Sequence, residues 1–113
     1  MILMPIVYVG DMDESVAFYE GLGFEVDLRS RSSHWTTLKA GDGAVLALHA
    51  ADGDTAGRVE LAMVADAEPL ERLADAAPVA RGIADEAFGR SLVLRDPNGL
   101  QIQVNEHDPE LNG

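Results

Sequence analysis

Aromatic and acidic side chains interrupt otherwise apolar stretches, and they are the first candidates for a ligand site. Glu60 lies within the run 59–64, while Tyr8, Trp35 and His49 lie in three other stretches. A carboxylate in a partly dry cavity can pair with a cation or act as a general base with a raised pKa. Aromatic rings can stack on a planar ligand or hold a cation. The structural alternatives are a solvated or ion-paired Glu60 and a Trp35 buried beneath a helix.

A further group of polar side chains lies near the end of the chain, in residues 89–106. The sequence Asp-Pro-Asn-Gly at 96–99 is typical of a hairpin turn, because proline presets one φ angle and Asn-Gly tolerates positive φ. Apolar and polar residues alternate on both sides of this turn, which is the period of a strand. We therefore predict a hairpin with one apolar face and one mostly polar face, open to water or to a ligand. The candidate ligand-binding residues here are Phe88, Ser91, Gln101 and Gln103.

Hydrophobic periodicity predicts the order strand, helix, strand, strand, strand in each half of the chain. In the first half, Asp11 can cap the helix with Glu14 three residues later, which resembles a capping box. In the second half, we expect Asp66 to cap the helix, with Pro69 in its first turn. The predicted strands are 2–9, 24–28, 34–39, 44–49, 59–64, 79–83, 88–95 and 100–106.

Each predicted helix has one apolar face, and polar segments separate or follow the elements. The face predicted for the first helix consists of Ser15, Phe18, Tyr19 and Leu22. The face predicted for the second helix consists of Leu70, Leu73, Ala74 and Ala77. The small and polar segment 50–57 is typical of a linker, and we expect residues 108–113 to be frayed.

The repeated order of elements determines the predicted fold. Each half has one helix to cover one face of its sheet, so the other face is left uncovered, and two such faces would enclose a trough. We predict a single α+β domain over 1–113, built from two βαβββ modules at 1–52 and 58–107. The modules form a cupped mixed sheet with the helices on its outer face.

Composition limits the classes of partner and compartment. The formal net charge is −12, and the chain has a single lysine, Lys39. Such a field repels nucleic acid and anionic lipid and favours cationic ligands, although acidic residues can also serve solubility alone. The chain has no cysteine, which excludes disulfides and thiolate metal sites. Without a signal peptide or a membrane-length apolar run, we expect a cytoplasmic protein.

Two motifs resemble a known superfamily. Val-Gly-Asp at 9–11, followed by Ser-Val-Ala-Phe-Tyr-Glu-Gly-Leu-Gly-Phe at 15–24, resembles the first module of the vicinal oxygen chelate superfamily. Phe-Gly-Arg at 88–90, running into Arg-Asp-Pro-Asn-Gly at 95–99, is similar to the end of the second module in its bleomycin-resistance branch. The resemblance implies paired βαβββ modules, a concave ligand site and usually a dimer. The superfamily includes glyoxalase I, extradiol dioxygenases, fosfomycin-resistance enzymes and antibiotic-sequestering proteins without catalysis.

The resemblance also implies metal-ligand positions, and these carry over to Met4, Ala47, Glu60 and Gln103. Only Glu60 is a good ligand for a hard divalent cation, because Ala47 has no donor and the Met4 and Gln103 side chains are poor ones. His49, two residues after Ala47, could add a second ligand. A catalytic metal needs at least three, so we predict neither metal nor cofactor.

Three functional hypotheses follow. The first is a metal-free protein, a homodimer, that binds or sequesters a small aromatic or cationic molecule, as antibiotic-sequestering relatives of the bleomycin-resistance branch do. The second is a glyoxalase- or dioxygenase-type lyase or isomerase, with Glu60 moving the proton if no metal is present. The third is a structural or regulatory module whose trough only mediates subunit pairing. The ligand contacts predicted under the first hypothesis are Tyr8, Trp35, His49, Glu60, Phe88, Ser91, Gln101 and Gln103.

Overall fold

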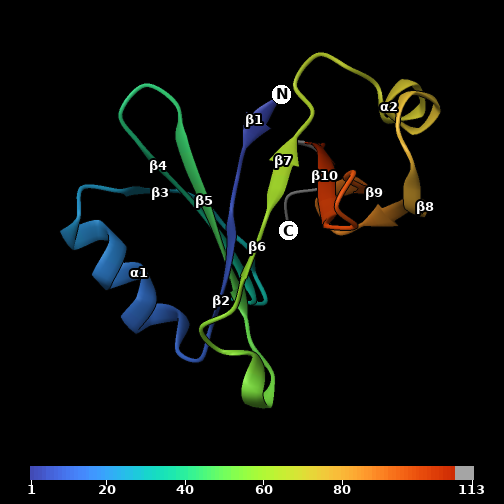
Figure 1. The fold of residues 1–113 in the computed structure, drawn as a ribbon. Helices are drawn as coiled ribbons and strands as arrows, with labels where there is room; N and C mark the ends of the chain where they lie inside the picture. The colour runs from blue at the N-terminus through green and yellow to red at the C-terminus, as the bar shows by residue number, and fades with distance from the viewer. Residues whose placement is uncertain (109–113) are drawn as a thin grey trace. The chain divides into compact units, whose positions relative to one another are not determined.

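The computed structural model describes residues 1–108 and divides the chain into two compact units (Figure 1). The N-terminal unit is Met4–Glu60, and the C-terminal unit joins Met1–Leu3 to the chain from Leu61 onward. Each unit contains one five-stranded mixed sheet and one α-helix. The predicted α+β class with mixed sheets is therefore confirmed. Residues 109–113, part of the segment expected to be frayed, lie outside the described residues.

The sheet of the N-terminal unit has the strand order β3-β4-β5-β2-β6. Neighbouring strands are antiparallel except for β2 and β5, which run parallel. A short 3-10 helix, η1 (Gly53–Thr55), lies in the predicted linker. The other elements are β2 (Ile6–Val9), α1 (Met12–Gly21), β3 (Glu25–Arg29), β4 (Trp35–Ala40), β5 (Ala44–Ala50) and β6 (Val59–Glu60).

Helix α1 begins as predicted, since the Asp11 side chain accepts a hydrogen bond from the backbone N–H of Glu14 at 3.0 Å. Its buried face differs from the prediction. Val16 is buried and Met12 and Tyr19 pack beside it, whereas Phe18 and Leu22 are exposed. The observed stripe places the apolar Met12 and Val16 against the sheet beside Tyr19, and Tyr19 belongs to the predicted stripe as well. Its partners on the sheet include Val9, Leu38 and Leu48.

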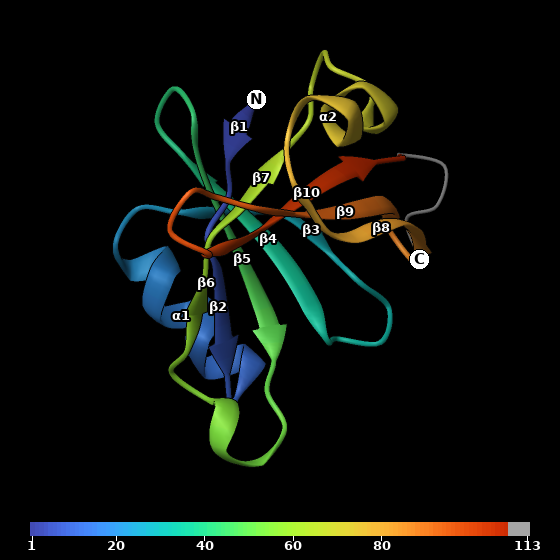
Figure 2. The same cartoon turned by 45° about the vertical axis from the view of Figure 1, so that its right-hand side comes forward.

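The sheet of the C-terminal unit has the order β8-β9-β10-β7-β1, and only the β10–β7 pair is parallel. Figure 2 shows β8, β9 and β10 side by side. The apolar face predicted for the hairpin forms the core, where Leu92 and Val104 are buried against Leu70 of α2. The elements are β1 (Ile2–Leu3), β7 (Ala62–Val64), α2 (Leu70–Ala76), β8 (Val79–Glu86), β9 (Gly89–Arg95) and β10 (Gln101–His107).

The start of helix α2 differs from the prediction. Its N-cap is Pro69, in an extended conformation and without a side-chain hydrogen bond, so Asp66 is not the cap. Asp66 instead forms an ion pair with the N-terminal amine of Met1. The extended backbone at Pro69 prevents the helix from beginning three residues earlier. The predicted buried face is confirmed at Leu70, with Leu73 and Ala74 packed beside it.

The predicted strands 2–9 and 59–64 are each divided between the two units. Pro5 lies between β1 and β2, and Leu61 lies between β6 and β7. In both places, one half of the predicted strand joins each sheet. As a result, each sheet has one short edge strand, β1 or β6, that comes from a predicted strand whose other half belongs to the other sheet. The modules predicted at 1–52 and 58–107 remain a prediction, and they differ from the compact units at these crossing points.

Candidate functional site

Three predicted ligand-binding residues form an aromatic row across the sheet of the N-terminal unit. Tyr8 of β2 pairs with His49 of β5, and His49 pairs with Trp35 of β4. Residues opposite each other on paired strands point to the same face of a sheet. Residues of the opposite parity, such as Val9 and Leu48, pack beneath α1. The aromatic row therefore lies on the face that α1 leaves uncovered.

The rings of the aromatic row are close enough to act as one surface. The ring centroids of Tyr8 and His49 are 5.0 Å apart, and those of His49 and Trp35 are 6.1 Å apart with the rings perpendicular. All three side chains are half-buried. The Nδ1 atom of His49 lies 2.7 Å from the carbonyl oxygen of Ala50, which can only accept. In the neutral ring Nδ1 therefore carries the proton, and Nε2 is left as an acceptor.

Glu60 lies beside the aromatic row. It is opposite Ile6 in the sheet, and its Oε2 atom accepts a hydrogen bond from the hydroxyl of Tyr8 at 2.6 Å. Burial raises the pKa of Tyr8 to about 12, helped by the hydrogen bond to Glu60 and its charge and opposed by Arg58. The phenol consequently remains a donor at neutral pH. The arrangement offers an acidic group next to aromatic rings, which can hold an organic cation or accept a proton.

The metal that the resemblance implies does not fit the residues present. Glu60, Ile6 and Ala47 are neighbours across the sheet, so the predicted position at Ala47 does lie near Glu60 but has no donor atom. Met4 is fully buried and offers only a thioether. Within residues 1–108, no three His, Asp or Glu side chains are grouped so that they could hold a metal ion. No step of a reaction can be assigned to a metal here.

In the C-terminal unit, the polar face of the hairpin has its own hydrogen-bond network. Ser91 is fully buried; its hydroxyl accepts from Arg81 Nη2 at 2.6 Å and donates to Glu86 Oε1 at 2.9 Å. Gln103 Nε2 donates to Oδ1 of Asn105 at 2.9 Å. A ligand role for Ser91 and Gln103 stays a prediction, and Ser91 has structural partners in any case.

Three network residues, Arg81, Glu86 and Asn105, were not selected as candidates from the sequence. Asn105 is fully buried and lies opposite Ser91 in the sheet. The same alternation that selected Gln103 also places Asn105 on the polar face, and this signal could have identified it. Arg81 comes from the neighbouring strand β8, whose register the sequence does not give.

The remaining two predicted contacts lie at the ends of the same unit. Gln101 is exposed at the start of β10, opposite Arg95. Phe88 precedes β9, and its ring centroid lies 5.2 Å from that of His107. Gly89, beside Phe88, lies against β10, where it is opposite His107. Ligand binding by Gln101 and Phe88 remains a prediction.

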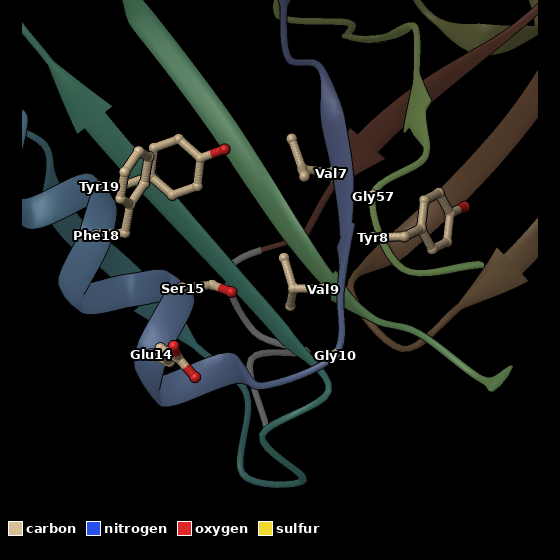
Figure 3. A pocket seen from close by; sticks show the side chains of 9 residues that line it. All are labelled: Val7, Tyr8, Val9, Gly10, Glu14, Ser15, Phe18, Tyr19 and Gly57. Atoms are coloured by element: carbon tan, nitrogen blue, oxygen red, sulfur yellow. The ribbon is translucent and has the colours of Figure 1, made fainter. Parts of the chain in front are cut away.

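A pocket of about 380 Å³ lies on the helix side of the N-terminal unit (Figure 3). Val7 and Val9 of β2 point toward α1, whereas the ring of Tyr8 points to the opposite side of the strand. This pocket was not predicted from the sequence. Phe18, in a helical stripe that the core does not use, was the available signal. The lining residues are Val7, Tyr8, Val9, Gly10, Glu14, Ser15, Phe18, Tyr19 and Gly57.

The helices of residues 1–108 include none with the length and apolar character needed to cross a membrane.

Comparison with known proteins places the fold. The family model described as Glyoxalase/Bleomycin resistance protein/Dioxygenase superfamily matches residues 2–104. The chain is similar to the crystal structure of NAD-dependent benzaldehyde dehydrogenase from Legionella pneumophila, with a TM-score of 0.64, 18% identity, and coverage of 94% of this chain and 99% of that one.

It is also similar to a glyoxalase/bleomycin resistance protein/dioxygenase superfamily member from Vibrio splendidus 12B01, with a TM-score of 0.59 and 22% identity. That likeness covers 92% of this chain and 97% of the other. At these identities the two structures support the fold alone. No curated protein matches the chain.

Proposed function

The chain belongs to the Glyoxalase/Bleomycin resistance protein/Dioxygenase superfamily, and we propose that it binds a small aromatic or cationic organic molecule without using a metal. The observation that carries this proposal is the aromatic row of Tyr8, His49 and Trp35 beside the carboxylate of Glu60. Small-molecule sites combine mostly apolar or aromatic walls with a few polar groups that fix orientation. The uncovered face of the N-terminal unit has both.

The charge of the site favours a cationic ligand over an anionic one. Glu60 supplies the carboxylate, and the whole chain has a formal net charge of −12. An ammonium or guanidinium group next to aromatic rings gains from their quadrupoles as well as from the carboxylate. Ligand binding by Phe88, Ser91, Gln101 and Gln103 of the C-terminal unit is a separate part of the proposal. We also propose that the protein is a homodimer in the cytoplasm and that its ligands include antibiotics.

The chemistry of the donor set supports binding without a metal. Of the positions that correspond to the family's metal ligands, Glu60 alone has a hard anionic donor, and Ala47 has none. A metal analysis of the purified protein tests this point directly. Near-stoichiometric nickel, zinc, manganese or iron that is lost on chelation would contradict it.

Trp35 gives a direct test, because it is the only tryptophan in the chain. We expect aromatic cationic antibiotics to quench Trp35 fluorescence and to raise the melting temperature. E60Q should weaken binding of a cationic ligand about tenfold, which corresponds to the roughly 1.5 kcal/mol of a hydrogen bond to a charged group. The matched control is E25Q, which removes an exposed carboxylate from β3. The proposal fails if the panel gives neither quenching nor a thermal shift, or if E60Q and E25Q behave alike.

The hydrogen bond between Tyr8 and Glu60 favours a second candidate, a metal-free isomerase or lyase. The carboxylate of Glu60 accepts a 2.6 Å hydrogen bond from the neutral phenol of Tyr8. If Glu60 removes a proton from a substrate, the same phenol can donate to the negative charge that develops on the substrate. In this case E60Q should abolish turnover and leave ligand binding in place. The two candidates therefore differ in whether E60Q affects affinity or only the rate.

A further inference from the structure

The pocket on the helix side of the N-terminal unit lies apart from the aromatic row. The ring of Tyr8 lies on one face of β2, whereas the side chains of Val7 and Val9 line the pocket on the other (Figure 3). Its volume of about 380 Å³ is within the usual range for small-molecule sites. The function proposed above does not involve this pocket.

One end of the pocket is apolar. Phe18 and Tyr19 of α1 lie there near Val7 (Figure 3). Phe18 is 61% exposed, which is unusual for a large aromatic residue, and its ring packs edge-on against Tyr19 at 5.1 Å. Val59, opposite Val7 in the sheet, is 66% exposed. Phe18 and Val59 take no part in the core, whereas Val7 and Tyr19 also pack against it.

The other end of the pocket is polar and acidic. Glu14 and Ser15 lie there, toward Gly10 (Figure 3). Glu14 is the only charged residue among those that line the pocket. Arg58 follows the pocket residue Gly57 in the chain but is not itself among the residues that line the pocket. With a formal net charge of −12 on the chain, a cation is favoured at this end.

We propose that this pocket binds an organic amine with an apolar body. The apolar body lies on Val7, Val9 and Phe18, and the ammonium group lies beside the carboxylate of Glu14, where the Ser15 hydroxyl can accept from it. The carboxylate of Glu14 lies at one end of the pocket and the apolar residues lie at the other. We therefore expect a ligand with its ammonium group at one end of an apolar body. This site shares only Tyr8 with the aromatic row, and neither proposal requires the other.

A matched pair of compounds tests the proposal, namely 4-phenylbutylamine and 4-phenylbutan-1-ol, which differ in the charged group. Each is titrated into ¹⁵N-labelled protein, and the amide chemical shifts are followed. We expect the amine to shift the amides of Val9, Gly10 and Ser15 and to bind about threefold to fivefold more tightly than the alcohol, as one exposed ion pair allows. Shifts confined to the amides of β4 and β5, or no shifts, would overturn the proposal.

Variants of α1 separate the charge from the apolar surface. E14Q should bring the affinity for the amine down to that for the alcohol. The substitution should leave α1 folded, because Gln is also favoured at this position of a capping box. E20Q removes another exposed carboxylate of α1 that does not line the pocket, and it should leave both affinities unchanged. F18A should weaken both compounds equally. Equal effects of E14Q and E20Q would show that only the general field of the chain acts, and the proposal would fail.

Discussion

The hydroxyl of Tyr8 donates a hydrogen bond to Oε2 of Glu60 at 2.6 Å, although the two residues are 52 positions apart in the chain. The bond exists because β6 returns to pair antiparallel with β2, with Ile6 opposite Glu60. Tyr8 also contacts the ring of His49. One phenol thus links the acidic group of the candidate site to its aromatic row.

We expect the phenol of Tyr8 to titrate at about pH 12, compared with its ordinary value of 10.0. Burial contributes most to the raised pKa, and Glu60 contributes through its hydrogen bond and its charge. Ultraviolet absorbance of tyrosinate measures this directly, because the only other tyrosine is Tyr19. Y8F should remove the late transition and Y19F should keep it. E60Q should lower the midpoint of Tyr8 but leave it above 10, since burial remains.

The same shift predicts how stability depends on pH. Folded Tyr8 keeps its proton to a higher pH than the unfolded chain does, so its contribution to the free energy of unfolding is intact below pH 10. That contribution falls between about pH 10 and 12 as the unfolded chain releases its proton first. Urea unfolding across this range should show a steeper decline for the wild type than for Y8F. Parallel curves would contradict the assignment.

Gly89 is a position where a side chain cannot be accommodated. Its φ is +147°, and a Cβ atom there would lie 2.0 Å from the carbonyl oxygen of Glu106 in β10. We expect G89A to lower the free energy of unfolding by at least about 2 kcal/mol, because the clash is with backbone and the strands must separate. G82A is the matched control in β8, where nothing lies within 4 Å of the added atom. Urea unfolding of both variants measures the difference, and equal losses would contradict this account.

Much of the fold could be predicted from the sequence because its signals are local. The Asp-Pro-Asn-Gly turn, the alternation around it and the Asp11 cap each depend on a few neighbouring residues, and all three are confirmed. The division of the strands at Pro5 and at Leu61 could not be predicted in the same way. It depends on which sheet each half joins, and that is decided by pairing between distant segments.

The site could be predicted in part for the same reason. Strand parity suggested Tyr8 and His49 but left the face of Trp35 open, and the lateral alignment of the three follows once β2, β5 and β4 are neighbours. The pairing of Tyr8 with Glu60 needed the register of β6, which the sequence does not encode locally. The pocket beside α1 was missed because two helical stripes competed, and only packing against the sheet shows which of them remains outside the core.

The hydroxyl of Ser91 is held from two sides, by Arg81 and by Glu86. We expect S91A to lower the free energy of unfolding by about 1 kcal/mol, because both partners are exposed and can turn to water after the hydroxyl is lost. The R81Q variant should have an effect of similar size, and the double variant should lose less than the sum of the two. Thermal and urea unfolding of the wild type, the two single variants and the double variant complete this double-mutant cycle. Strict additivity would show that the contact between Ser91 and Arg81 contributes nothing to stability.

Arg90 connects helix α2 to the sheet of the C-terminal unit through two carboxylates. It donates to both oxygens of Glu71, at 2.7 and 3.1 Å, and to both oxygens of Glu106, at 2.8 and 3.1 Å. The hydrogen bonds from Arg90 lower the pKa of Glu71 from 4.5 to about 2. A carboxyl group with a lowered pKa stabilises the fold above its unfolded value and loses that contribution as the pH falls through its folded value.

We therefore expect E71Q to be less stable than the wild type at neutral pH, with the difference shrinking as the pH falls from 4.5 toward 2. Added salt should reduce the difference at neutral pH, because the ion pair is exposed and screened. D75N removes another carboxylate from the same helix and serves as the control, since Arg90 binds Glu71 and Glu106. Urea unfolding at several pH values measures each protein. A difference between E71Q and the wild type that stays constant down to pH 2 would mean that Arg90 does not hold Glu71 in solution, and that α2 is anchored by Leu70 and its apolar neighbours alone.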